Sequence, residues 1–190
     1  MTRKPQIIVG VLLVTMLLVL GACAPAPSPK EVELKYDDGE SDGSCSSGQS
    51  GFSVLFSSSA TSFAISKVKV FTNLRGTGYE ERKPKLEIWD NDFNVKYISE
   101  EPYTSFSSKP SWVSLQIPNV TVRNDFYVVF HTNSRREGGV YINYDSSVIN
   151  EHSEMAAGGV VTSWVWERIP KETTNWMIRV IGTPMAPDEG

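Results

Sequence analysis

Apolar and polar residues alternate one by one in several short segments after residue 30, which is the pattern of β-strands buried on one face. The clearest example is residues 111–118, and the alternation recurs in residues 125–131 and 176–180. Apolar residues at helical spacing are not sustained anywhere after residue 30. We expect the following apolar members of the three segments to face a core: Val113, Leu115, Ile117, Phe126, Val128, Phe130, Trp176, Ile178 and Val180.

Further strands are expected where β-branched and aromatic residues gather between turn-rich stretches. They are residues 32–36, 52–56, 64–71, 85–89, 95–99, 140–144 and 161–166. Glycine, asparagine and aspartate mark turns between many of them. About ten short strands at this spacing predict an all-β fold, an antiparallel β-sandwich of jelly-roll-like form over residues 31–183. Residues 184–190 are expected to form a flexible tail.

The first residues have the three-part layout of a secretion signal. Arg3 and Lys4 are basic, residues 7–20 are apolar and uncharged, and Gly21 and Ala22 are small. A membrane-spanning helix needs about 20 apolar residues, and this run is shorter. The pattern therefore predicts a cleaved signal peptide over residues 1–22 rather than a permanent span.

The stretch Leu20-Gly21-Ala22-Cys23 resembles the lipobox of bacterial lipoproteins. The resemblance implies cleavage before Cys23, a diacylglycerol thioether on its thiol, and acylation of the new amine, for example with palmitate. Two or three acyl chains anchor a protein firmly, whereas one does not. The expected location is the cell membrane or outer membrane, facing away from the cytoplasm; an ordinary secreted protein is the alternative. The proline-rich residues 23–30 are expected to be an extended tether.

The charge of the chain limits its partners. The formal net charge is −4, and removal of Arg3 and Lys4 with the signal leaves −6. This balance argues against nucleic acid as a partner and against adhesion to anionic lipids through a basic face. We expect the membrane to be contacted through the lipid anchor.

Four short motifs along the chain resemble those of small surface modules of bacteria and archaea. These modules are β-sandwiches that open on Tyr-Asp-Asp-Gly and close on a Met-Ile-Arg strand. The counterparts are residues 36–39 and 177–179, and residues 86–90 and 125–128 look similar too. The resemblance supports the sandwich fold and implies no particular activity.

Cys45 has no partner for an intrachain disulfide once Cys23 carries a lipid. It lies in a stretch of small residues expected to be a loop, and we interpret it as a tolerated, half-buried thiol. An intermolecular disulfide and a reactive cysteine are the alternatives. A nucleophilic thiol needs an oriented histidine, and His131 and His152 are both far away in the sequence.

An acidic loop opens the predicted domain. Asp37, Asp38 and Asp42 lie in one glycine-containing turn, where their oxygens could converge on a structural calcium ion that fixes the first strand. A solvated acidic turn without a cofactor is the alternative. Residues 90–94 also place oxygen ligands at alternate positions, but Val95 stands where an EF-hand needs glycine, so we interpret them as a hairpin turn.

Trp164 and Trp166 lie two residues apart, so a strand would place them on one face. With Tyr141 and Tyr144 they could form an aromatic platform on which sugar rings or peptide side chains stack. The alternative is that these aromatic residues close the end of the core. The platform is the candidate ligand-binding surface.

Motifs for catalysis are scarce: the chain has no Gly-x-Ser-x-Gly, no His-Glu-x-x-His and no phosphate-binding glycine loop. We therefore do not expect an enzyme. The function predicted is a surface-tethered binding or interaction module for a glycan, peptide or protein ligand. The alternatives are an extracytoplasmic hydrolase with an acidic site, whose carboxylate pair a sequence cannot reveal, and a purely structural envelope component.

Overall fold

A computed structural model describes residues 30–77, 83–134, 138–147, 151–158, 160–162 and 174–185. The first half of the fold contains β1 (Val32–Leu34), β2 (Gly43–Cys45), β3 (Gly51–Phe56), β4 (Ser62–Gly76), β5 (Lys85–Asp90), β6 (Val95–Glu100) and a 3-10 turn, η1 (Tyr103–Ser105). The second half contains β7 (Ser111–Arg123), β8 (Phe126–His131), β9 (Gly138–Asp145), β10 (Ser153–Ala157), β11 (Val160–Thr162), β12 (Asn175–Trp176) and β13 (Ile178–Met185).

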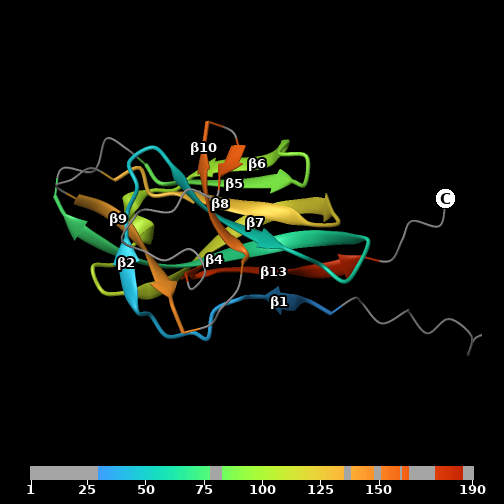
Figure 1. Cartoon of the computed structure of the whole chain (residues 1–190), viewed down its shortest axis with the longest axis horizontal. Coiled ribbons are helices and arrows are strands. Elements are labelled where there is room, and N and C mark those ends of the chain that lie inside the picture. Colours follow the sequence, from blue (N-terminus) through green and yellow to red (C-terminus); the bar gives the residue numbers. More distant parts are fainter. Residues whose placement is uncertain are drawn as a thin grey trace, which may run out of the picture.

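The strands form two antiparallel sheets that pack as a sandwich (Figure 1). The seven-stranded sheet has the order β1-β13-β4-β9-β12, with β7 paired to β4 and β2 paired to β9. The six-stranded sheet has the order β11-β10-β3-β8-β5-β6. From β3 to β10 the chain passes repeatedly between the sheets, as in a jelly roll. The predicted all-β sandwich is therefore confirmed.

The core lies between the sheets and is made by the alternation seen in the sequence. Phe126, Val128 and Phe130 of β8 are fully buried, whereas the intervening Tyr127 packs on the outer face of the same sheet. Each of the nine residues expected to face inward is buried. Aromatic rings stack across the core, with Phe126 between Phe56 and Phe63 at centroid distances of 5.7 and 6.1 Å.

The structure differs from the expected elements in four places, the first being that Pro184 and Met185, expected in the flexible tail, pair with β4 as the end of β13. Cys45 lies in strand β2, not in a loop, because residues 43–45 pair with β9. Residues 153–157 form β10, a strand that was not predicted. Met177 is buried and interrupts the last predicted strand, because its backbone N–H donates to Asn143 while its carbonyl accepts from Phe71.

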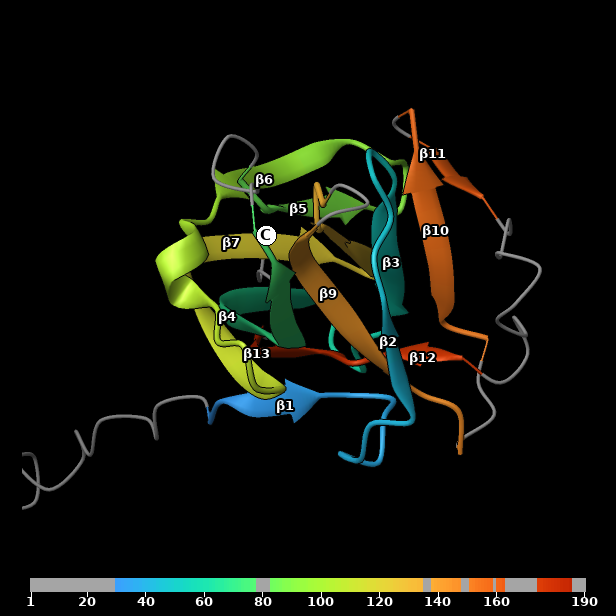
Figure 2. The same cartoon turned by 90° about the vertical axis from the view of Figure 1, so that its left-hand side faces the viewer.

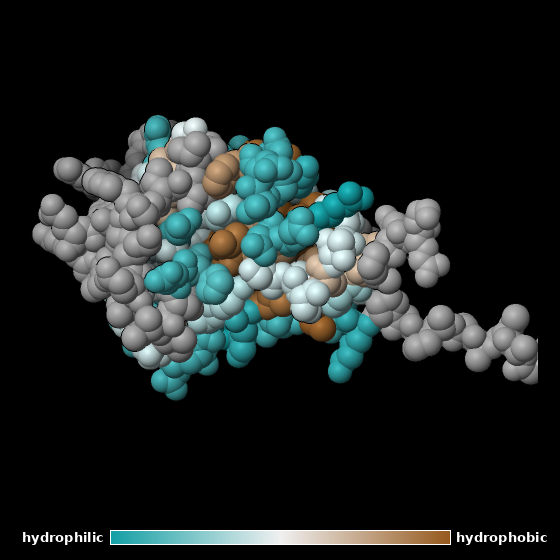
Figure 3. Space-filling view, turned by 45° about the vertical axis from the view of Figure 1, so that its right-hand side comes forward, coloured by the Kyte–Doolittle hydropathy of each residue, from teal (hydrophilic) through white to brown (hydrophobic). Residues whose placement is uncertain are grey.

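The strand that follows the predicted tether lies far from one side of the six-stranded sheet. Strand β1, which follows the predicted tether, runs along the edge of the seven-stranded sheet, and in Figure 2 it lies on the side opposite β5, β6 and β11. Figure 3 shows hydrophilic side chains over much of the described surface, with hydrophobic residues in separate patches between them. No helix within the described residues is long and apolar enough to cross a membrane.

Candidate functional site

A pocket of about 340 Å³ opens on the outer face of the six-stranded sheet. Period two places Lys85, Glu87 and Trp89 of β5 on this face, because Leu86 and Ile88 between them point into the core. Neighbouring strands and turns complete the wall. The full lining is Gln49, Lys85, Glu87, Trp89, Phe93, Val95, His131, Ala156, Ala157 and Gly158.

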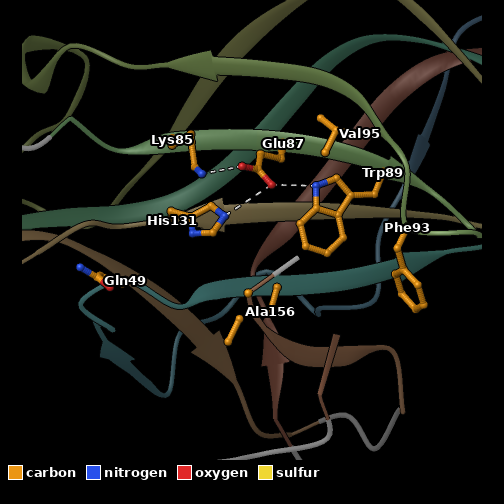
Figure 4. A pocket seen from close by; sticks show the side chains of 10 residues that line it. Gln49, Lys85, Glu87, Trp89, Phe93, Val95, His131 and Ala156 are labelled. Atoms are coloured by element: carbon orange, nitrogen blue, oxygen red, sulfur yellow. Dashed lines mark hydrogen bonds and ion pairs between the residues drawn. The ribbon is translucent and has the colours of Figure 1, made fainter. Parts of the chain in front are cut away.

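Glu87 is the centre of the polar part of this pocket (Figure 4). Its carboxylate accepts a hydrogen bond from Nε1 of Trp89 at 2.7 Å and one from Nζ of Lys85 at 2.5 Å. Nε2 of His131 lies 3.7 Å from the carboxylate oxygen that accepts from Trp89. Glu87 and His131 are both buried, so water screens the electrostatic interactions of the Glu87 carboxylate only weakly.

The protonation states of this group follow from its surroundings. Burial acts to raise the pKa of Glu87, but the hydrogen bond and charge of Lys85, the hydrogen bond from the indole of Trp89 and, when it is protonated, the imidazolium of His131 outweigh burial and leave the pKa below its usual value. Burial lowers the pKa of His131, Lys85 lowers it further, and Glu87 only partly compensates. At neutral pH the pocket therefore holds a carboxylate, an ammonium group and a neutral imidazole.

The imidazole of His131 lies over the backbone of β3, where Gly51 makes room for it. A Cβ atom at Gly51 would lie 2.4 Å from Cγ1 of Val129 and 2.9 Å from Cε1 of His131, so any larger residue would displace the ring. Nε2 of His131 is buried and makes no hydrogen bond within the described structure. A buried polar atom without a partner costs free energy, so this nitrogen is a natural contact for a ligand.

Phe93 forms the exposed rim of the pocket and has an unusual backbone conformation. Its φ is 62°, in the left-handed region, which is rare for a bulky side chain. The turn is fixed by Asp90, whose carboxylate accepts from the backbone N–H groups of Asp92 and Asn94. Phe93 is 40% exposed, and its ring stacks on that of Tyr127 at a centroid distance of 5.3 Å. Residues 90–94 thus form the predicted hairpin turn, and the turn presents an aromatic ring at the pocket.

The proposed aromatic platform is only partly within the described residues. Trp164 and Trp166 lie outside them. Tyr144 packs against the core and meets Trp176 edge-on at 6.3 Å, while Tyr141 lies under the guanidinium of Arg75 at 4.7 Å. Because they are three residues apart on β9, the two tyrosines lie on opposite faces of the sheet, and the structure does not bring them together.

The three aspartates of the acidic loop have different partners. Asp37 is buried and paired with Arg179 of β13, whose Nε lies 3.1 Å from both of its oxygens. Asp38 accepts from the Ser147 hydroxyl at 2.9 Å, and Asp42 accepts from the Ser146 backbone at 2.7 Å. The described residues contain no group of three acidic, histidine or cysteine side chains arranged to hold a metal. Calcium binding at this loop stays a prediction.

Of the two cysteines, Cys45 lies within the described residues and Cys23 does not. Cys23 lies outside the described residues, so its lipidation stays a prediction. Cys45 is half-buried and free, and burial raises the pKa of its thiol to about 12. At neutral pH the thiol is protonated, which makes it a poor nucleophile and agrees with its interpretation as a tolerated thiol.

Sequence reasoning missed the pocket, although part of its signal was present. Lys85, Glu87 and Trp89 alternate with apolar residues, so the strand already predicted there has one charged and aromatic face. A lysine, a glutamate and a tryptophan side by side on one strand face are a candidate binding surface. The missing information was that β8 pairs with β5 and places His131 beside Glu87.

Comparisons with known proteins show the fold and nothing finer. No family model matches the chain, and no curated protein matches it. The structure is similar to that of the clostridial cysteine protease Cwp84 after propeptide cleavage, with a TM-score of 0.51 and 12% sequence identity. The match covers 85% of this chain and 42% of the protease chain, so this chain corresponds to less than half of the larger protein. At this identity the likeness extends to the β-sandwich alone.

Proposed function

We propose that the chain is a lipid-anchored binding module on the outer side of a membrane, and that the pocket around Glu87 is its ligand site. The observation that carries the proposal is the side chain of His131, which lines a pocket rimmed by the exposed Phe93 and whose buried Nε2 has no hydrogen-bond partner within the described structure. Convergent polar groups beside aromatic surface are typical of ligand pockets.

The position of the tether supports this assignment. Residues 23–30 would lead into β1, at the edge of the seven-stranded sheet, whereas the pocket opens on the outer face of the other sheet (Figure 2). An extended proline-rich segment reaches about 3 Å per residue and holds a domain clear of a bilayer. A module anchored in this way presents the pocket toward the surroundings of the cell.

The chemistry of the pocket favours binding over hydrolysis. Glycoside hydrolysis needs two carboxylates on either side of the scissile bond. Among the described residues that line the pocket, Glu87 is the one carboxylate, and it is already engaged by Lys85 and Trp89. A carboxylate held in this way orients a ligand rather than transferring a proton.

Replacing Cys23 with serine is expected to remove the anchor, because serine cannot form the thioether. The variant should leave the detergent phase in a detergent-phase separation, or stay unprocessed at the higher mass of the precursor. Replacing Cys45 with serine is the matched control and should leave partitioning unchanged. If the Cys23→Ser variant were processed normally and still entered the detergent phase as the wild type does, Cys23 would not carry the lipid anchor.

The ligand site is tested by screening the full-length protein, in detergent micelles, against immobilised polysaccharides, oligosaccharides and peptides. We expect binding to at least one of these classes and a loss of tenfold or more, about 1.4 kcal/mol, in the Glu87→Gln variant. Glu100→Gln is the control, because Glu100 lies on the neighbouring strand, is exposed and does not line the pocket. Binding that Glu87→Gln leaves unchanged would place the ligand elsewhere.

A further inference from the structure

The two ends of the pocket offer different chemistry. Figure 4 shows Lys85, Glu87 and His131 gathered at one end and Phe93 at the other, with Trp89 between them. Val95 beside the aromatic end is 53% exposed. A ligand that fills the pocket must therefore present polar groups at one end and an apolar face at the other.

We infer that the pocket holds one ring of a neutral sugar, whose C–H face packs on Phe93 and whose hydroxyl group donates a hydrogen bond to Nε2 of His131. This inference rests on the proposed function, in which the pocket is the ligand site. It adds the class of ligand and the residues that select it.

A hydroxyl group matches the polar end. Nε2 of His131 is 3.7 Å from the Glu87 carboxylate, which is too far for a hydrogen bond, and the histidine is only 8% exposed. Since burial favours the neutral imidazole, Nε2 accepts a hydrogen bond in the tautomer that carries its proton on Nδ1. Lys85 has further N–H donors. A hydroxyl can donate to the imidazole and accept from the ammonium group at the same time.

The charge of the pocket points to a neutral ligand. Lys85 and Glu87 form a close pair at 2.5 Å, and their charges cancel. The other described lining residues are the neutral His131, the amide of Gln49 and apolar side chains. An anionic sugar would be attracted by Lys85 but repelled by Glu87, and a cationic amine would meet the reverse, so neither gains as much as a neutral polyol.

The same arrangement predicts a pH dependence. The charged groups that face His131 are Lys85 and Glu87 of β5, while Gly51 of β3 and Ala156 of β10 bring no titratable group. Protonation turns Nε2 into a donor that pairs with Glu87, and the acceptor for the sugar hydroxyl is lost. Because the pKa of His131 lies below 6.5, affinity should be constant near pH 7 and fall as the pH drops through that pKa.

The experiment is calorimetric titration of the full-length protein in detergent micelles. The probes are methyl glycosides and short oligosaccharides of neutral hexoses and N-acetylhexosamines, compared with glucuronate, glucosamine and tripeptides. We expect the neutral sugars to bind best, and His131→Asn and Phe93→Asn each to weaken them by roughly tenfold. Asparagine tolerates the left-handed conformation, so Phe93→Asn keeps the turn, and melting curves check both variants. Ile98→Ala, an exposed residue of β6 outside the pocket, should bind normally.

Different results would contradict the neutral sugar, the hydrogen bond to His131, or the pocket as the ligand site. Preference for a charged sugar or a peptide, with sensitivity to Glu87→Gln, would overturn the neutral sugar and leave the pocket as the ligand site. Sugar binding that His131→Asn and low pH leave unchanged would overturn the hydrogen bond to His131. No binding by any of the three classes of probe would count against both.

Discussion

Replacing Asp37 with alanine is expected to lower the free energy of unfolding by about 3–5 kcal/mol, the usual cost of breaking a buried ion pair. The side chain of Asp37 is fully buried, and that of Arg179 is 12% exposed. Loss of the carboxylate leaves a guanidinium that is stacked on Trp112 at 4.2 Å, with Glu33 at 3.7 Å as its ion-pair partner and the exposed Asp38 as a second nearby anion. The pair also connects the loop after β1 to β13, so the first strand should become less stable.

Urea unfolding of the Asp37→Ala variant measures this effect, and Asp38→Ala is the matched control. Asp38 is the next residue, is exposed, and makes hydrogen bonds to Glu40 and Ser147 instead of an ion pair. We expect little change in the control. Equal destabilisation by the two variants would contradict a special role of the Asp37–Arg179 pair and would show that the acidic residues of the loop act together. Repeating the unfolding measurements in calcium and in chelator tests whether a cation holds these residues together.

Replacing Phe126 with alanine is expected to lower the free energy of unfolding by about 3–5 kcal/mol, because it opens a large cavity in the core. Phe126 is fully buried on β8 and stacks on Phe56 of the same sheet and on Phe63 of the opposite sheet. Its ring therefore connects the two layers. Denaturant unfolding followed by circular dichroism measures the change.

Phe126→Leu is the control for the cavity, since leucine fills much of the same space. It should cost less than about 1.5 kcal/mol. If alanine were no more harmful than leucine, the sheets would not depend on this aromatic contact, and the described packing between β8 and β4 would be wrong.

Much of the fold could be predicted because the sandwich is built from one-sided strands. Val113 and Leu115 alternate with exposed residues, and burial follows that alternation directly. The sequence does not predict β2 or β10, because residues 43–45 are small and residues 153–157 include no β-branched or aromatic residue, the types that favour strands. The interruption at Met177 depends on backbone partners from β9 and β4, which lie far away in the sequence.

The candidate site was less predictable because its parts come from distant segments. Glu87 and His131 are separated by more than forty residues, and only the pairing of β5 with β8 brings them together. Asp37 shows the same limit. The sequence marks its carboxylate as a candidate calcium ligand but gives no sign of its ion pair with Arg179. Neither partner could be identified without knowing the strand order.

The most direct test of the binding function is a nuclear magnetic resonance titration that follows the indole N–H of Trp89, assigned with a Trp89→Phe variant. This proton donates to Glu87 inside the pocket, so it reports on any ligand that contacts the carboxylate. With the oligosaccharide or peptide that the full-length protein binds, we predict a saturable shift of this signal, with the other indole signals changing less. A ligand that saturates the protein while leaving the Trp89 signal unchanged would contradict the assignment of the pocket as the binding site.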